Sequence, residues 1–291
     1  QDATIQFALA EAYEGLGKRN AMRNSLERAA ELDQNYLPPK FGLAALAIQE
    51  KDAAAAAEMI SGLREHIDAG TPQMLELEAQ LAELGEDWDA AVANRRKLHE
   101  KSPGSENLRL LSMALWNADQ RSESLSLQEQ WLAQHPQDLW VRMEVAQRYL
   151  YLGRPGDAAA AYRELLEIDP DNTTALNNLA SLILETNPEE ALAYAEKAHA
   201  LAPDSTAVMD TLAGTLLRTG DLARAARLNE RALDAEPGNP SFLYRRAQVL
   251  HAGNDTDSAI QLLTELLVRD EVFAERESAQ ALLEELQHGD G

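Results

Sequence analysis

The residues that could carry chemistry in this chain are its histidines and its many carboxylates. The six histidines are scattered, and none forms a pair at the spacing that zinc sites use. The chain has no cysteine, which excludes disulfides, thiol catalysis and thiolate metal ligands. Glycine-rich phosphate loops and the motifs of serine nucleophiles are also missing from the sequence. We therefore predict that the chain is not an enzyme and that it binds no metal and no cofactor.

One acidic segment, Asp169-Pro-Asp171-Asn172, is similar to part of a calcium loop. It lacks the glycine and the bidentate glutamate that such a loop requires. Similar proline turns follow the neighbouring segments of the chain, so a structural turn is the better interpretation.

The charge of the chain restricts its partners. The chain contains 26 lysines and arginines and 49 aspartates and glutamates, which gives a net charge of −23. Such a surface repels nucleic acids and anionic lipids, and it attracts cationic proteins or amino-sugar polymers. Solubility alone is the simpler explanation of the same charge. No apolar run is long enough to span a membrane, so we expect no nucleic-acid partner and no membrane span in this segment.

The elements that position these residues are predicted by a repeat. Pro136, Pro170, Pro203 and Pro237 stand 34, 33 and 34 residues apart, and the residues between them recur in register. Each interval contains two apolar runs at helical spacing, separated by a breaker such as Gly220. This period is typical of stacked helix pairs, and alanines at recurring positions allow the paired helices to approach closely.

This series of small, aromatic, glycine, alanine and proline positions resembles the tetratricopeptide repeat. The resemblance implies an all-α fold, a right-handed α-solenoid of tandem helix-turn-helix repeats with a C-terminal capping helix, as a single domain over residues 1–291. In the first repeat Met22 occupies the central alanine position, and in the fourth Ser124 lies near it. We place the eight repeats and the capping helix at about 3–36, 37–70, 72–105, 106–138, 139–172, 173–205, 206–239, 240–272 and 273–287.

Several phrases of the sequence are more specific than the repeat. They are Trp131-Leu-Ala-Gln-His-Pro, Ala175-Leu-Asn-Asn-Leu-Ala, Ala195-Glu-Lys-Ala-His-Ala-Leu-Ala-Pro and Asp210-Thr-Leu-Ala-Gly. With them the sequence resembles the C-terminal part of tetratricopeptide lipoproteins associated with bacterial exosortase (PEP-CTERM) and exopolysaccharide systems. It departs from that family at Ala213-Gly214, where glycine and tryptophan are usual. The resemblance implies a periplasmic or outer-membrane location, with a lipidated N-terminus upstream of Gln1. A cytoplasmic location is the alternative.

In such a stack the first helices of successive repeats line a concave wall, where we expect the partner to bind. With Val145, Ala146 and Tyr149 taken as buried, the helical period predicts which residues form this wall. They are Met143, Gln147, Tyr151, Asn177, Ser181, Asp210, Arg218, Tyr244, Gln248 and His251.

Asn177 and Asn178 suggest a sharper hypothesis, since an asparagine amide can pair with both the donor and the acceptor of a peptide backbone. Lysines, which such a clamp for carboxyl termini also uses, are missing from the predicted wall, and a solvated or capping role is the alternative.

The sequence thus predicts a non-enzymatic scaffold for protein–protein interaction, which binds a protein or an extended peptide. The second resemblance implies that this scaffold acts in the export of exopolysaccharide or of PEP-CTERM surface proteins. Two alternatives stay open. One is direct binding of an extended, cationic polysaccharide along an acidic groove, and the other is a cytoplasmic peptide-binding adaptor similar to a co-chaperone.

Overall fold

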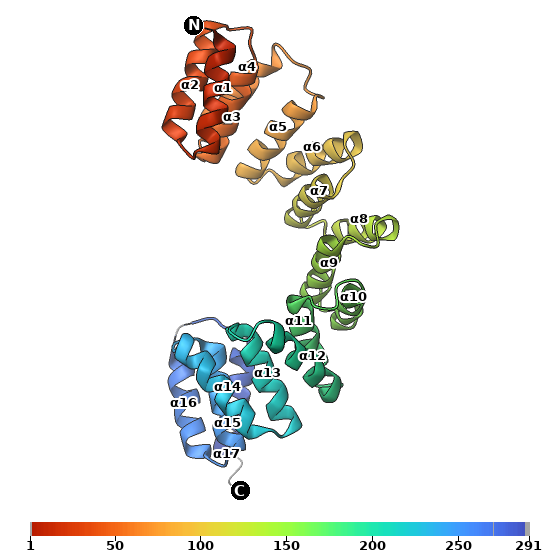
Figure 1. Ribbon diagram of the computed structural model, residues 1–291, viewed down its shortest axis with the longest axis vertical. Helices are drawn as coiled ribbons and strands as arrows, with labels where there is room; N and C mark the ends of the chain where they lie inside the picture. The colour runs from red at the N-terminus through yellow and green to blue at the C-terminus, as the bar shows by residue number, and fades with distance from the viewer. Residues whose placement is uncertain (1, 270, 289–291) are drawn as a thin grey trace. The chain divides into compact units, whose positions relative to one another are not determined.

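The structure is a computed structural model that describes residues 2–269 and 271–288. It divides into two compact units, 1–135 and 136–291, which are described here one at a time. Within the described ranges every regular element is a helix, and 17 helices follow one another along the chain (Figure 1). The predicted all-α fold is therefore confirmed. Gln1, to which the expected upstream anchor would be joined, lies outside the described residues.

The first unit contains eight helices: α1 (Ala3–Gly15), α2 (Arg19–Leu32), α3 (Pro38–Gln49), α4 (Ala53–Arg64), α5 (Pro72–Leu84), α6 (Trp88–Lys101), α7 (Ser105–Asn117) and α8 (Arg121–Gln134). The second contains nine in its described part: α9 (Leu139–Tyr151), α10 (Pro155–Ile168), α11 (Thr173–Ile183), α12 (Pro188–Leu201), α13 (Thr206–Thr219), α14 (Leu222–Ala235), α15 (Pro240–Ala252), α16 (Thr256–Val268) and α17 (Arg276–His288). Each predicted repeat contains one pair of these helices. The additional helix α17 begins at Arg276, three residues later than the sequence predicts.

Local sequence sets where the helices begin and end. The side chain of Asp221, for example, accepts a hydrogen bond of 3.1 Å from the backbone N–H of Arg224. Such a cap contributes about 1 kcal/mol, because it pairs a backbone donor that the helix leaves open. Aspartate side chains cap five more helices, at Asp2, Asp52, Asp87, Asp138 and Asp255. Gly220 ends α13 with φ 91°, a left-handed conformation that glycine adopts without steric cost.

The two helices of a pair meet at small buried residues. Seven of the eight first helices place an alanine at this contact, and the second helix usually presents another twelve residues later. The pairs, all at most 1% exposed, are Ala44 with Ala56, Ala79 with Ala91, Ala146 with Ala158, Ala180 with Ala191, Ala213 with Ala225 and Ala247 with Ala259. Short side chains here let two backbones approach closely, so the apolar residues on either side interdigitate.

The fourth pair replaces both alanines with serines. Ser112 and Ser124 are fully buried, and the Ser124 hydroxyl donates to the Ser112 carbonyl at 2.7 Å. The Ser112 hydroxyl lies 3.5 Å from the Ser124 carbonyl. Because each hydroxyl reaches the backbone of the other helix, the substitution keeps the contact small without leaving a buried polar group unpaired.

Successive pairs stack within each unit mainly because the second helix of one pair packs on the first helix of the next, as α2 does on α3 and α12 on α13, and some first helices also contact one another. Helix α3 contacts α5 in the first unit, and α13 contacts both α11 and α15 in the second. The last helix, α17, packs on α16 and buries Ala279 and Leu286. This is the arrangement of a tetratricopeptide-like solenoid. None of the helices described is long and apolar enough to cross a lipid bilayer.

The first unit also buries one cation. The side chain of Arg95 on α6 is 2% exposed, and it donates to Glu83 and to Glu76, both on α5, at 2.7 Å. A guanidinium can serve two carboxylates because its five N–H donors form a rigid fork. Helices α5 and α6 are thus joined by charge as well as by the contact of Ala79 with Ala91.

The small contacts generate a prediction for the second unit. Ala180→Trp and Ala213→Trp should each lower the free energy of unfolding by about 3 kcal/mol, because a large ring cannot enter a closely packed contact. The measurement is urea unfolding of the full chain followed by circular dichroism. Ala252→Trp is the control, since Ala252 is exposed at the end of α15 and the change should cost under about 0.5 kcal/mol. Equal losses in all three variants would show that the assigned contacts are wrong.

The buried cation generates a second prediction. Arg95→Leu should destabilise the first unit by about 3 kcal/mol, because two partly buried carboxylates lose their partner. Arg96→Leu removes a neighbouring arginine whose pair with Glu123 is exposed, so it should cost less than about 1 kcal/mol. Thermal and urea unfolding of both variants would measure the difference, and a harmless Arg95→Leu change would contradict the proposed role.

Candidate functional site

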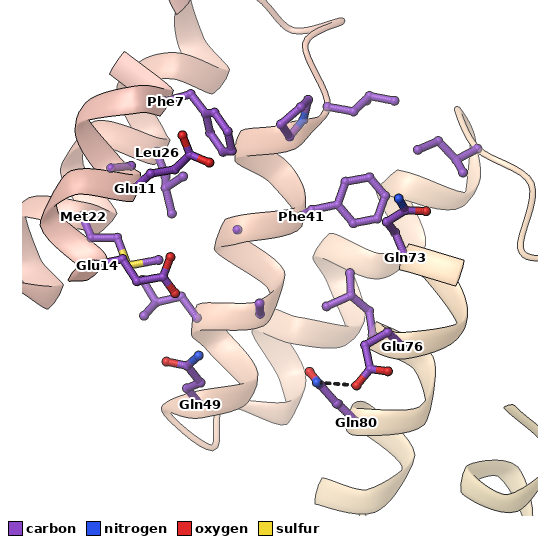
Figure 2. Close-up of a pocket in the computed structure, with 18 of the residues that line it drawn as sticks. Phe7, Glu11, Glu14, Met22, Leu26, Phe41, Gln49, Gln73, Glu76 and Gln80 are labelled. Carbon is purple, nitrogen blue, oxygen red and sulfur yellow. Dashed lines mark hydrogen bonds between the residues drawn. The ribbon is translucent and has the colours of Figure 1, made fainter. Parts of the chain in front are cut away.

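A groove lies in the first unit between α1, α3 and α5 (Figure 2). Its volume is about 740 Å³, within the range of ligand pockets in proteins. Each of the three helices presents one stripe at helical spacing toward the hollow. The stripes are Phe7, Glu11 and Glu14 on α1, Phe41, Ala45 and Gln49 on α3, and Gln73, Leu77 and Gln80 on α5.

The floor of the groove is apolar. Leu26 of α2, which is 1% exposed, reaches the floor beside Gly42 of α3. A Cβ atom at Gly42 would lie only 3.0 Å from the Leu26 side chain, so glycine makes room for this leucine. The ring of Phe7 stands edge-on to the ring of Tyr36, with 5.8 Å between their centroids. This contact holds one wall of the groove in place.

Met22 of α2 contributes a flexible apolar side chain to the groove. It occupies the position at which the second helix of most other pairs has a buried alanine, and here it is half-buried and lines the groove. The opposite residue, Ala10, is still 1% exposed and also lines the groove. Helices α1 and α2 still pack closely against each other, and the long, flexible thioether adds an adaptable apolar surface to the groove.

The rim of the groove is polar and acidic. Glu76 accepts from Gln80 at 2.7 Å and from Arg95, so this carboxylate already has partners within the unit. Glu11 and Glu14 are exposed, and neither makes an ion pair with any residue that the structure describes. Figure 2 places these two carboxylates beside Met22 and Leu26. Such a surface can accept an apolar side chain and cationic or hydrogen-bond donor groups together.

The wall predicted from sequence lies entirely in the second unit, and none of its residues lines this groove. Gln147, Ser181, Arg218 and His251 are exposed, and Tyr151 is 62% exposed. Arg218 pairs with Glu185 at 3.3 Å, and His251 lies 3.3 Å from the Thr256 hydroxyl. Met143 instead packs against the buried cluster of α9 to α12.

Three more predicted residues of the wall, Asp210, Tyr244 and Gln248, are joined in a polar network through Arg245. Arg245 donates to Asp210 at 3.2 Å and to Gln248 at 2.7 Å, and Gln248 donates to the Tyr244 hydroxyl at 3.0 Å. Tyr244 is only 8% exposed. Burial raises the pKa of Asp210 above its ordinary value, although the Arg245 guanidinium acts in the opposite direction. These side chains are thus occupied with one another.

The same arginine explains the glycine at position 214. A Cβ atom there would lie 2.7 Å from the Arg245 guanidinium carbon, so Arg245 occupies the space of a side chain. The place where the resembling family has a tryptophan is filled here by an arginine from the next helix pair.

The asparagine pair of α11 is directed inward. Asn178 donates to the hydroxyl of Tyr162 at 3.0 Å, and Tyr162 is fully buried. The side-chain oxygen of Asn177 is buried and has no hydrogen-bond partner among the described residues. The side-chain amide of Asn178 is therefore a hydrogen-bond partner of a buried tyrosine inside the unit.

The acidic turn before α11 acts as a cap. The side chain of Asn172 accepts from the Ala175 N–H at 3.1 Å and donates to Asp169 at 3.0 Å. Lys197 pairs with Asp171 at 3.0 Å. Within the described part of the chain, no group of three or more histidines, aspartates and glutamates is placed to hold a metal ion.

Sequence reasoning did not find the groove, although one signal pointed to it. The prediction concentrated on the repeats that match the pattern best, whereas the groove forms in the first three pairs. Met22, which departs from the alanine pattern, is the residue that could have directed attention there.

Comparisons with known protein families identify the repeat. Models of the tetratricopeptide repeat match residues 3–36, 139–182 and 211–272. These models describe the repeat alone and give no support to the resemblance to exosortase-associated lipoproteins. The comparison with curated proteins gives no significant match.

Two solved structures are similar in fold. The C-terminal part of a TPR repeat-containing protein from Cytophaga hutchinsonii is 13% identical, with a TM-score of 0.61 over 82% of this chain and 98% of that one. MamA from residue 41 to its end, from Desulfovibrio magneticus RS-1, is 17% identical, with a TM-score of 0.50 over 61% of this chain and 98% of that one. At these identities the likeness shows the fold alone. Together with the matched models and the stacked helix pairs, it identifies this chain as one that carries tetratricopeptide repeats.

Proposed function

We propose that the chain is a non-catalytic scaffold that binds a peptide segment of a partner protein in the groove of α1, α3 and α5. Tetratricopeptide repeats imply a surface for protein–protein interaction. The observation that carries the proposal is the groove itself, in which an apolar floor lies inside a polar rim. Recognition of a peptide needs both, because apolar anchors supply affinity and polar groups fix the backbone.

The dimensions of the groove suit a short segment of chain. A stripe of eight helical residues, such as Phe7 to Glu14, extends about 10 Å along the axis. This length accommodates about three residues of an extended peptide. Gln49 and Gln73 line the groove, and each amide offers a donor and an acceptor for a peptide backbone. Partners with longer segments would continue past the ends of the stripe.

A second candidate function is binding of an extended, cationic polysaccharide in the bacterial envelope. One observation favours it: Trp140 and Tyr151 of α9 are 45% and 62% exposed. Eleven residues are close to three helical turns, so both rings lie on one face, where their flat surfaces could stack on sugars. The acidic charge of the chain would attract amino groups on the polymer. An envelope location, which the second sequence resemblance implies, belongs to this proposal as well.

The peptide-binding proposal predicts that filling the groove abolishes binding. Ala45→Phe places a ring on the groove floor, and peptides selected on the full chain from a displayed random library should no longer bind it. Ala57→Phe is the matched control, because Ala57 is exposed on α4 and does not line the groove. Circular dichroism would verify that both variants fold. Selection that yields no peptides, or peptides that bind both variants equally, would refute the proposal.

The polysaccharide proposal predicts a preference among sugars. Amino-sugar oligomers should bind the full chain more tightly than neutral oligomers. An increase in salt concentration should weaken the binding of the amino-sugar oligomers. The double change Trp140→Ala and Tyr151→Ala should weaken this binding severalfold, whereas Leu201→Ala, which removes an exposed leucine from α12, should not. Isothermal titration would measure all three proteins. Flat titrations with both kinds of oligomer would remove this candidate.

A further inference from the structure

We propose that the groove selects a basic, amphipathic peptide segment. An aromatic or aliphatic side chain of the segment enters the apolar floor, and lysine or arginine side chains beside it pair with Glu11 and Glu14. The proposal rests on the proposed function and specifies the chemistry of the partner.

The charged residues that line the groove are all glutamates. Helix α1 carries two glutamates and α5 carries three, and neither helix contains a lysine or arginine. Lys40 of α3 does not line the groove, and no lysine or arginine does. Arg19 lines a smaller hollow beyond Glu14, at one end of the groove only. The potential inside the groove is therefore negative, which favours cationic ligands.

The carboxylates of the groove differ in what they can still bind. Glu76 is held by Arg95 and Gln80, so it contributes shape and a fixed hydrogen-bond acceptor. Glu11 and Glu14 remain without an ion pair among the described residues, and they lie one helical turn apart on α1. Their separation along the axis is about 4.5 Å, so two neighbouring basic side chains of a bound segment can each reach one carboxylate.

The apolar floor increases the preference of these two glutamates for basic over acidic peptides. A ligand that fills the space over Met22 and Leu26 also removes water from the adjacent carboxylates (Figure 2). Charge-assisted hydrogen bonds gain strength in such a setting. A peptide with acidic residues at the same places would bring like charges together and leave Glu11 and Glu14 unpaired, so it is rejected. Selection therefore depends on repulsion as well as on attraction.

The test uses the full chain and three fluorescein-labelled synthetic peptides. Each has twelve residues with phenylalanine and leucine anchors at the same positions, and the remaining positions carry mainly lysine, serine or glutamate. Fluorescence anisotropy at physiological salt should rank the affinities as lysine above serine above glutamate. The double variant Glu11→Gln and Glu14→Gln should bind the lysine peptide at least about tenfold more weakly than the unchanged chain.

A matched control separates the site from the overall charge of the chain. Glu58→Gln with Glu100→Gln makes the same change in net charge at exposed positions outside the groove, and it should alter the affinity less than about twofold. Equal losses in the two double variants, or serine and glutamate peptides that bind as tightly as the lysine peptide, would overturn the inference.

The groove-filling variant separates this inference from the proposed function. If Ala45→Phe abolishes binding of all three peptides while their charge makes no difference, the selection for basic peptides is wrong and the peptide-binding function stands. If Ala45→Phe leaves the lysine peptide bound as before, the groove is not the site, and both proposals fail.

Discussion

The rest of this structure depends on close contact between two helices at a pair of small side chains. An alanine that is fully buried on each helix brings the backbones together, and the neighbouring leucines and valines then fill the remaining space. Where both alanines are replaced, the new residues are also small. They are Ser112 and Ser124, and the hydroxyl of each reaches the backbone carbonyl of the other. The first pair keeps this close packing although Met22 replaces one alanine, and the Met22 side chain becomes part of the groove between α1, α3 and α5.

Charge connects the groove to the core of the first unit. Arg95 is buried beneath α5, where it holds Glu83 and the groove residue Glu76 in place. Because the guanidinium is bonded to both carboxylates, they form a rigid part of the structure, whereas Glu11 and Glu14 of α1 have no ion pair among the described residues. The groove thus combines a fixed side with a chemically open one. Such preorganisation lowers the entropy cost of binding, since fewer side chains must be ordered by the ligand.

The sequence predicted the helix pairs well because their signals are local. The spacing of apolar residues, the prolines that follow the helices and the aspartate caps all act within a few residues, and each predicted repeat contains one helix pair. The site was harder to predict because it depends on which side chain fills a space between helices. The period placed Asp210, Tyr244 and Gln248 on an open wall, but it could not show that Arg245 crosses to Gly214 and joins all three. Contacts of this kind link residues about one repeat apart, so the pattern of a single helix does not contain them.

The two units use their first helices in different ways. In the second unit, Tyr244, Arg245 and Gln248 of α15 form a hydrogen-bonded network with Asp210 of α13, and Arg245 covers Gly214. A ligand there would have to break these hydrogen bonds before making its own, which reduces the net gain from binding. In the first unit, Leu26 fills the space beside Gly42, and a groove lined by small residues such as Ala10 and Ala45 stays open above an apolar base. Exposed apolar surface inside an acidic rim is costly to keep unless something covers it, and this cost is the physical reason to look for the partner at α1, α3 and α5.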